Sequence, residues 1–421
     1  MTKSITKLLA LLLVCALSFG LMAGCGGGAN EPANDESAGG GAPADDAGES
    51  ADDAGDAGEP ADKADEPDEE PAGDTIRIGV LVADVSGEEA LGFRAYYEDY
   101  IAANYNVTFS YTEELGDAAA EKSAIEKFAA QGYDAIISLS SSDRATQLQT
   151  CIDNGLYYAV ASGMLDDAQY EQFKDSEYFV GQIGPSMAVE YEAGLAMGQY
   201  YAGQGVKNVG IYGAFIPNPM HVYRAAGLLV GLGCTYGGAG DMDAVVGQIF
   251  GDQGIDPSKV AGDVTIVGYL QGFGDTTFDE LFGILGQAPD AFLSVGMATT
   301  FFADNLDGMG IPYCDIDSFT TGNAAHMADG TLTYIAGKYA SSIGPIFAAV
   351  VNAVNGNAVR DADGNAISIS QGYAVATDSA AFDSIFSGDQ GDSPIYSKAV
   401  LDTVIGAGVS YDDFVALVEA N

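Results

Sequence analysis

A short motif that occurs twice constrains the fold of this chain more than any other feature. Residues 132–143, GYDAIISLSSSD, read as the end of a helix, a buried apolar strand and a polar loop. Residues 288–297, APDAFLSVGM, repeat that order, with an aspartate before the apolar run and a serine at its end. An apolar strand that follows a helix is typical of a parallel sheet covered on both faces. Two such units far apart in the sequence predict two similar α/β lobes.

The length of the chain agrees with two lobes. Its 421 residues exceed what one hydrophobic core usually organises, and a hydrophobic content of 48% is that of a globular protein. Ligands of such sheets bind outside the carboxyl ends of the strands, so two facing sheets would enclose a cleft. We therefore expect an α/β fold of two doubly wound parallel-sheet lobes with a ligand cleft between them.

The first 25 residues have the pattern of a secretory signal peptide. Lys3 and Lys7 precede an apolar run that ends in small residues, and this run is shorter than a comfortable membrane span. The last five residues, LMAGC, resemble a bacterial lipobox, in which the cysteine, here Cys25, becomes the lipidated N-terminus of the mature chain. An ordinary signal peptide or N-terminal anchor with a chance cysteine is the alternative.

Residues 26–74 form a low-complexity acidic segment. They contain 17 acidic residues and one lysine, a net charge of −16, and almost no large apolar side chains. Such a segment cannot bury enough surface to offset its chain entropy, so we expect it to be disordered, and its like charges should extend it. It reads as a spacer that holds a folded domain away from a membrane.

The chain from residue 75 onward is also strongly acidic, with 12 basic and 44 acidic residues. This charge argues against nucleic acid, anionic lipid and polyanionic partners. Because cations are so few, Arg224 and Lys338 are informative; each is either a ligand-binding group or one half of a buried ion pair.

Three cysteines, Cys151, Cys234 and Cys314, remain outside the predicted signal segment. Their number is odd and no CxxC pair occurs, so one disulfide is allowed but none is required. Three buried free thiols are the favoured interpretation.

Hydrophobic periodicity and turn residues place strands and helices along the rest of the chain. In the first lobe we expect strands at 76–83, 107–111, 134–138, 157–161 and 178–183, with helices at 87–104, 118–131 and 144–154. The pattern then restarts, with strands at 206–213, 264–269, 290–294, 313–317 and 330–336 and helices at 186–205, 220–232, 277–286, 299–308 and 341–355. A hairpin at 359–370 and closing helices within 396–421 complete the chain. The predicted N-terminal lobe is 75–184 with 339–372, and the C-terminal lobe is 185–338 with 373–421.

Catalytic motifs are missing from the sequence. It has no P-loop, no HExxH and no GxSxG elbow, and His221 and His326 are its two histidines. The run 361–365, DADGN, resembles a calcium loop, but its glycine comes too early, so a hairpin turn is favoured. We expect no enzymatic activity, no cofactor and no metal.

The candidate ligand site consists of polar and aromatic residues near the predicted strand ends. Convergent polar groups in an apolar pocket are typical of sites that bind small polar molecules, and aromatic rings can stack on apolar ligand faces. Helix capping is the alternative role for each Ser, Asp and Asn that precedes a helix. The candidates are Asp84, Ser86, Phe93, Ser140, Ser142, Asp143 and Ser162 in the first lobe, and Phe215, Asn218, His221, Arg224, Gln271, Asp275 and Asp317 in the second, with Lys338 at its end.

With two lobes and a lipobox-like segment, the chain resembles the type I periplasmic binding protein family, in particular its sugar-binding branch, which includes ribose-binding protein. The local matches are IRIGVLVA at 76–83, ISLSSSD at 137–143, VGIYGAF at 209–215, the RAAG run that begins at Arg224, and YCDIDSF at 313–319. The resemblance implies two lobes joined by three crossovers that close around a ligand. Family members deliver solutes to ABC importers, and some feed chemoreceptors.

The resemblance also implies roles for single residues. Asp317 matches the carboxylate after the late strand near the hinge, Lys338 falls where sugar binders often have Gln, and Phe93 falls near their stacking aromatics. The chain departs at 162–163, Ser-Gly instead of an acid and Arg, and at 296–297, Gly-Met instead of Asn and Asp. These departures argue against a simple pentose or hexose, and a lysine in the pocket suits a ligand with a carbonyl or anionic group.

These observations together predict a monomeric, extracytoplasmic, lipid-anchored solute-binding protein that captures a sugar-like or nucleoside-like ligand for an ABC permease. Its place would be the cell membrane, at the cell surface or in the periplasm. A sensory module of the same fold that docks on a receptor is the alternative from another class, and an extracytoplasmic enzyme is a third.

Overall fold

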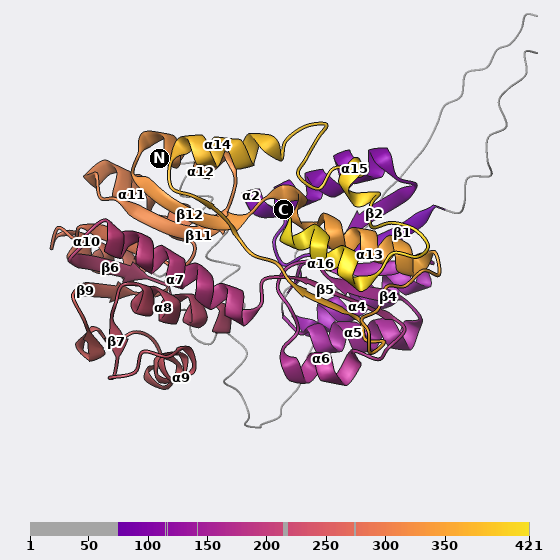
Figure 1. Cartoon of the computed structure of the whole chain (residues 1–421), viewed down its shortest axis with the longest axis horizontal. Helices are drawn as coiled ribbons and strands as arrows, with labels where there is room; N and C mark the ends of the chain where they lie inside the picture. Colours follow the sequence, from indigo (N-terminus) through magenta and orange to yellow (C-terminus); the bar gives the residue numbers. More distant parts are fainter. Residues whose placement is uncertain are drawn as a thin grey trace, which may run out of the picture.

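The computed structural model describes residues 75–113, 115, 117–140, 142–213, 218–272 and 275–420. These residues form two α/β lobes that lie side by side, each built on a six-stranded sheet (Figure 1). The predicted fold class is confirmed.

The first lobe is organised by a sheet with the strand order β13-β5-β4-β3-β1-β2, in which all neighbours are parallel. The central strand β3 is buried along its whole length, as expected for a continuous apolar run between two helical layers. The strands are β1 (Ile76–Leu81), β2 (Val107–Tyr111), β3 (Ala135–Ser138), β4 (Tyr157–Val160), β5 (Phe179–Gly184) and β13 (Ile367–Ser370).

The second lobe repeats this topology. Its sheet has the order β14-β12-β11-β10-β6-β9, so β9-β6-β10-β11-β12 follows the same path as β2-β1-β3-β4-β5. Only β14 is antiparallel to its neighbour among these described strands. The strands are β6 (Asn208–Tyr212), β9 (Thr265–Leu270), β10 (Ala291–Ser294), β11 (Tyr313–Ser318), β12 (Leu332–Lys338) and β14 (Ala374–Ala376).

The repeated sequence motif occupies equivalent places in the two sheets. β3 pairs with β1 and β10 pairs with β6 in the same parallel arrangement. The aspartate before each strand makes an equivalent hydrogen bond to the neighbouring strand. The Asp134 carboxylate accepts from the backbone N–H of Arg77 at 2.7 Å. The Asp290 carboxylate accepts from the backbone N–H of Asn208 at 2.9 Å. Each aspartate therefore fixes the start of the neighbouring strand.

Helices cover both sheets (Figure 1). Those that precede the second lobe are α2 (Glu88–Ala95), the π-helical η1 (Tyr96–Ile101), α3 (Ala102–Asn104), α4 (Ala118–Ala130), α5 (Arg144–Asn154) and α6 (Asp167–Phe173). The second lobe contains α7 (Met187–Gly203), α8 (Pro219–Gly231), α9 (Met242–Asp252), η2 (Pro257–Lys259), α10 (Asp275–Leu285), α11 (Ala298–Met309), α12 (Thr321–Asp329) and α14 (Ser379–Gly388). The chain returns to the first lobe in η3 (Ala340–Ile343), α13 (Gly344–Val354), α15 (Lys398–Leu401) and α16 (Tyr411–Glu419).

Helices α7 and α8 approach each other closely through glycine. A Cβ atom on Gly194 would overlap the carbonyl oxygen of Arg224, and one on Gly227 would overlap that of Tyr191. Only glycine allows the two backbones to come this near. The contact brings the middle of α7 beside the middle of α8.

The chain crosses between the lobes after β5, after β12, between β13 and β14, and again after α14. The last crossing corrects the predicted lobe boundaries, which place 373–421 in the C-terminal lobe. α15 and α16 lie on the first lobe instead, where the Tyr411 hydroxyl donates to the Ser368 carbonyl at 2.9 Å and Leu401, Phe414 and Leu417 are buried. Their apolar faces are covered by α13 of that lobe.

A segment between α8 and β9 was not expected. It contains α9 and the two-stranded ribbon of β7 (Thr235–Tyr236) and β8 (Val260–Ala261). Strands of two residues have no alternating pattern that could reveal them. In the described residues the three cysteines are free and buried, and no helix has the length and apolarity to span a membrane.

Candidate functional site

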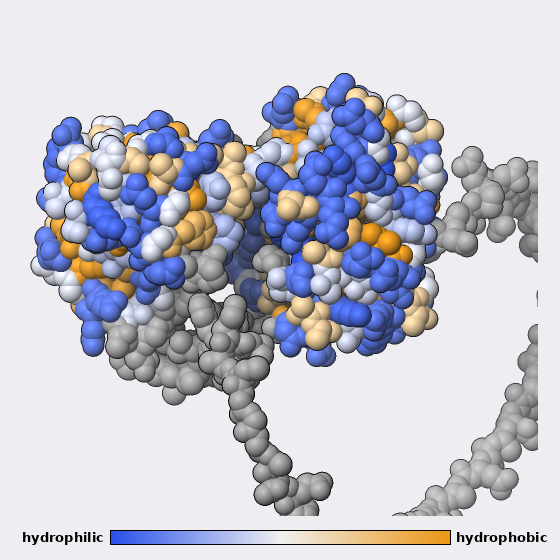
Figure 2. All heavy atoms as spheres, turned by 90° about the horizontal axis from the view of Figure 1, so that it is seen from below, coloured by the Kyte–Doolittle hydropathy of each residue, from blue (hydrophilic) through white to orange (hydrophobic). Residues whose placement is uncertain are grey.

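A hollow lies between the two lobes, which Figure 2 shows from below. A cavity of about 320 Å³ is lined by residues of both lobes. Its walls come from α2, from the ends of β11 and β12, and from the segment around the end of α14. The lining residues are Glu88, Glu89, Leu91, Gly92, Phe93, Ser318, Phe319, Thr320, Thr321, Lys338, Tyr339, Ala340, Phe386 and Gln390.

Lys338 lies at the centre of the contacts between the lobes. Its Nζ is 3.2 Å from Oε1 of Glu89 and 2.9 Å from Oγ of Ser162, and it lies 5.3 Å from the ring centroid of Phe93. The side chain is 15% exposed. Lys338 ends a strand of the second sheet and its three partners belong to the first lobe, so its ammonium group joins the two lobes.

Glu89 makes a second connection across the cleft, because its other carboxylate oxygen accepts a hydrogen bond from the Ser318 hydroxyl. The neighbouring Glu88 accepts one from the backbone N–H of Gly322 at 2.9 Å. Burial would raise the pKa of Glu89, but the charge of Lys338 and the hydrogen bonds from Ser318 and Lys338 outweigh it and lower that pKa. Glu89 is therefore an ionised acceptor held between residues of the other lobe.

Asp317 provides a half-buried carboxylate at the end of β11. It accepts hydrogen bonds from the Thr299 hydroxyl and from the N–H of Ser318, both at 2.8 Å. Asp315, two residues earlier, is fully buried and accepts from the Ser294 hydroxyl at 2.7 Å. Burial, reinforced by the charge of Asp315, raises the pKa of Asp317 to about 7, and burial also raises the pKa of Asp315.

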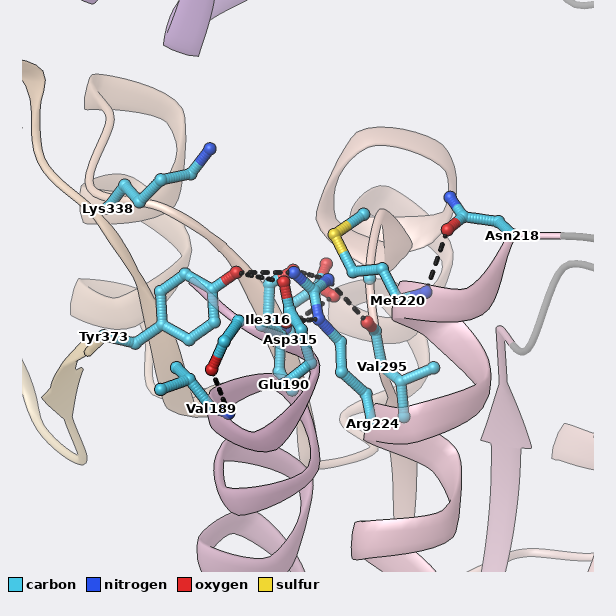
Figure 3. A network of polar contacts seen from close by, with 12 residues as sticks. Val189, Glu190, Asn218, Met220, Arg224, Val295, Asp315, Ile316, Lys338 and Tyr373 are labelled. Atoms are coloured by element: carbon cyan, nitrogen blue, oxygen red, sulfur yellow. Dashed lines mark hydrogen bonds and ion pairs between the residues drawn. The ribbon is translucent and has the colours of Figure 1, made fainter. Parts of the chain in front are cut away.

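Arg224 forms a separate buried network, shown in Figure 3. Its Nε lies 2.6 Å from Glu190, one Nη donates to the Tyr373 hydroxyl at 2.8 Å, and the other donates to the Val295 carbonyl at 3.0 Å. Tyr373 in turn donates to Glu190 at 2.9 Å. The alternative role of Arg224, a buried ion pair, is thus present. The network ties α7, α8 and the end of β10 to the crossover between β13 and β14.

Several other candidates serve as helix caps. Asp143 accepts hydrogen bonds from Thr146, as the N-cap of α5, and Asn218 accepts one from the N–H of Met220, as the N-cap of α8. Asp84 is exposed and accepts hydrogen bonds from the N–H groups of Ser86 and of the residue before α2. Capping therefore accounts for the contacts of Asp143 and Asn218, whereas Asp84 stabilises a turn in its own loop and Ser142 is exposed.

The remaining candidates lie apart from the contacts of Lys338. Ser140 is buried and donates to Glu121 in the first lobe, while Gln271 is exposed and donates to the carbonyl of Gln253. His221 is buried in α8, where burial and the charge of Arg224 lower its pKa to about 3, so it is neutral. Phe215 and the side chain of Asp275 lie outside the described part of the chain.

Arg144 supports the loop that carries Ser162. Its guanidinium donates to the carbonyls of Met164 at 2.8 Å, Ser140 at 3.2 Å and Ser162 itself. Gly163 has a φ of +75° and lies against this guanidinium. The loop after β4, where the resemblance would place an acid and an arginine, is thus held by an arginine from α5.

Three residues with contacts at this site were not among the candidates predicted from the sequence: Glu89, Ser318 and Thr299. Glu89 precedes Phe93 by four residues on α2, so the two share one helical face. That spacing is the one local signal that could have identified it.

The comparisons agree with this architecture. A structure from Mycobacterium smegmatis in complex with β-D-fucofuranose has a TM-score of 0.52 and 14% identity, covering 74% of this chain and 94% of its own. An ABC transporter periplasmic solute-binding protein from Actinobacillus succinogenes with bound D-allose has a TM-score of 0.53 and 13% identity, covering 73% and 99%. The periplasmic component of an arabinose ABC transporter from Shewanella has a TM-score of 0.50 and 18% identity, covering 72% and 93%. No family model and no curated protein sequence matches the chain.

Proposed function

We propose, from the type I periplasmic binding protein fold that this chain has, that it is a solute-binding protein that captures a small polar molecule for an ABC importer. The observation that carries the proposal is the set of polar groups from both lobes that meet at the carboxyl ends of the two sheets. Ser162 and Glu89 come from the first lobe, while Asp317 and Lys338 come from the second. Side chains in these positions can bind one ligand from both sides at once.

The chemistry of these groups favours a ligand rich in hydroxyl groups. Hydroxyls can donate to the carboxylates of Glu89 and Asp317 and accept from Lys338, and the half-buried ring of Phe386, which lines the cavity, offers an apolar face for a sugar ring. Structural neighbours with bound D-allose and β-D-fucofuranose support this class. The sequence expectation that Lys338 calls for an anionic ligand is weakened, because Glu89 already balances its charge.

Binding would act by closing the lobes. A ligand that contacts both lobes has a higher affinity for the closed arrangement and shifts the equilibrium toward it. We further propose that Cys25 carries the lipid that holds the protein at the outer face of a membrane, and that residues 26–74 act as the spacer. The proposed role requires no chemical turnover of the ligand.

A thermal-shift screen tests the proposed function. The chain without residues 1–25 would be exposed to sugars, nucleosides, amino acids and small acids. A ligand at 100 times its dissociation constant should stabilise the fold by about 2.7 kcal/mol, which raises the melting temperature measurably. A hit that is recovered chemically unchanged supports the proposal. Conversion of the ligand would support an enzyme instead, and a panel without hits would count against the polar-solute function.

A further inference from the structure

The cleft contains more carboxylates than basic side chains, even after each basic side chain is paired with its carboxylate partner. Lys338 is balanced by Glu89, and Arg224 is balanced by Glu190. Asp317 has no basic side chain among its hydrogen-bond and ion-pair partners in the described residues; its oxygens accept from a hydroxyl and a backbone N–H. In the part of the chain that the structure describes, the carboxylate of Asp317 therefore has no counter-charge.

The groups around Asp317 increase this imbalance. Asp315 on the same strand and Glu89 across the cleft both repel its negative charge. Lys338 at the end of the adjacent β12 is engaged with Glu89, and Thr299 from α11 contributes a neutral hydroxyl. A positive charge supplied from outside would be attracted by the carboxylates of Asp315 and Asp317.

The walls of the cleft are also suited to a cation. The ring of Phe93 already faces the ammonium group of Lys338, but Phe319, Tyr339 and Phe386 also line the cavity. Aromatic faces attract ammonium groups through their quadrupoles. The net charge of −46 on the whole chain adds a long-range attraction for positive ligands.

We propose that the cleft selects an amine-bearing sugar, whose protonated amino group binds the carboxylate of Asp317 while its hydroxyls meet Glu89, Lys338 and Ser162. This inference rests on the proposed function and names the class of ligand. The amine supplies the counter-charge that the described residues do not provide. An acidic sugar would place a further negative charge beside Asp315 and Asp317.

The test uses hexoses that differ only at carbon 6, on both the gluco and the galacto skeletons. The amino-6-deoxy sugar, the neutral sugar and the uronate present an ammonium, a hydroxyl and a carboxylate at the same place. Calorimetry on the chain without residues 1–25 at pH 7.5 should give a dissociation constant at least tenfold lower for the amine than for the neutral sugar, with the uronate weakest. Asp317→Asn should remove the preference for the amine.

Glu126→Gln is the matched control, because it removes one carboxylate from the exposed face of α4 and should leave the order of the three ligands unchanged. A second measurement is the pH dependence of the dissociation constants. Affinity for the amine should rise between pH 5.5 and 7.5 as Asp317 ionises, and affinity for the neutral sugar should change less.

The outcomes separate the two proposals. Equal or tighter binding of the neutral sugar or the uronate overturns the amine inference and leaves the solute-binding function standing. A hit in the wider thermal-shift panel with no hexose binding has the same meaning. Absence of binding by every hexose and every member of that panel overturns both.

Discussion

The ammonium group of Lys338 and the carboxylate of Glu89 lie 3.2 Å apart although 249 residues separate them in the sequence. One belongs to the last parallel strand of the second sheet, and the other to the first helix of the first lobe. With Ser162 and Ser318 they form a chain of polar contacts across the cleft. These contacts hold the two lobes in the arrangement seen in this structure.

Replacing Glu89 by alanine should therefore favour a more open ligand-free protein, because it removes the partner of both Lys338 and Ser318. Small-angle X-ray scattering would report the opening as a larger radius of gyration. Glu126→Ala removes an exposed carboxylate far from these contacts and should leave the radius unchanged. Equal radii for the wild type and the Glu89 variant would show that this pair does not influence closure.

Asp317 should make the stability of the ligand-free protein fall as pH rises. Its pKa is about 7 in the folded chain, against about 3.9 for an unperturbed aspartate, so the folded state holds a proton that the unfolded state releases. The stabilisation is fully present below about pH 4 and is lost as pH rises through 7, with an upper limit of about 4 kcal/mol. Urea denaturation of wild type and Asp317→Asn at several pH values measures it.

In the same denaturation experiment, Asp290 should contribute to stability with the opposite pH dependence. Hydrogen bonds from the N–H groups of Lys207 and Asn208 lower its pKa, so its contribution is present at neutral pH and is lost as pH falls through the folded value. Asp290→Asn should thus reduce the loss of stability in acid, whereas Asp317→Asn should flatten the decline toward neutral pH. Identical pH profiles for both variants would contradict the assignment.

The contact between α7 and α8 should be very sensitive to added volume. Gly227→Ala places a methyl group against the carbonyl oxygen of Tyr191, and we expect a loss of about 2 kcal/mol or more in the free energy of unfolding. Gly247→Ala is the control, because that glycine lies exposed within α9 with open space around its Cβ position. Its replacement should stabilise the protein slightly, by up to about 1 kcal/mol. Equal effects in chemical denaturation would mean that the close approach is not required.

Glu190→Gln should destabilise the protein by about 3–5 kcal/mol, because it leaves the buried guanidinium of Arg224 without a counter-charge. Tyr373→Phe removes one hydroxyl from the same network and should cost about 1–2 kcal/mol. Denaturation curves of the two variants check this order. A smaller effect for Glu190→Gln would contradict a charge-based role for the network.

Cys25→Ser should release the protein from membranes into the soluble fraction if Cys25 carries the lipid. Cys15→Ser lies within the same segment and should leave the protein membrane-bound. Fractionation of cells that express each variant distinguishes them. Release by both substitutions, or by neither, would argue against lipidation at Cys25.

The repeated motif was enough to predict two lobes and their parallel sheets, because the aspartate, the buried strand and the polar loop are local features. The end of the chain was misplaced for a physical reason: α15 and α16 have apolar faces, but nothing in their sequences specifies which lobe they cover. Contacts with α13 and β13, which belong to the first lobe, determine that α15 and α16 cover that lobe.

The site was predicted less completely than the fold. A serine, aspartate or asparagine before a helix can either cap the helix or bind a ligand. Asp143 and Asn218 cap their helices. Glu89 was missed because its partners, Lys338 and Ser318, come from the opposite lobe and no local pattern connects them. Lys338 was identified by its rarity in an acidic chain, but its counter-charge became visible only in three dimensions.

The central claim is that a ligand is bound between the lobes by groups that include Asp317. Its most direct test is calorimetry of the best ligand from the thermal-shift panel with wild type and Asp317→Ala, while circular dichroism verifies the fold. We predict that the substitution raises the dissociation constant at least tenfold in a protein that remains folded. Unchanged affinity would remove Asp317 from the site and contradict the account of the cleft.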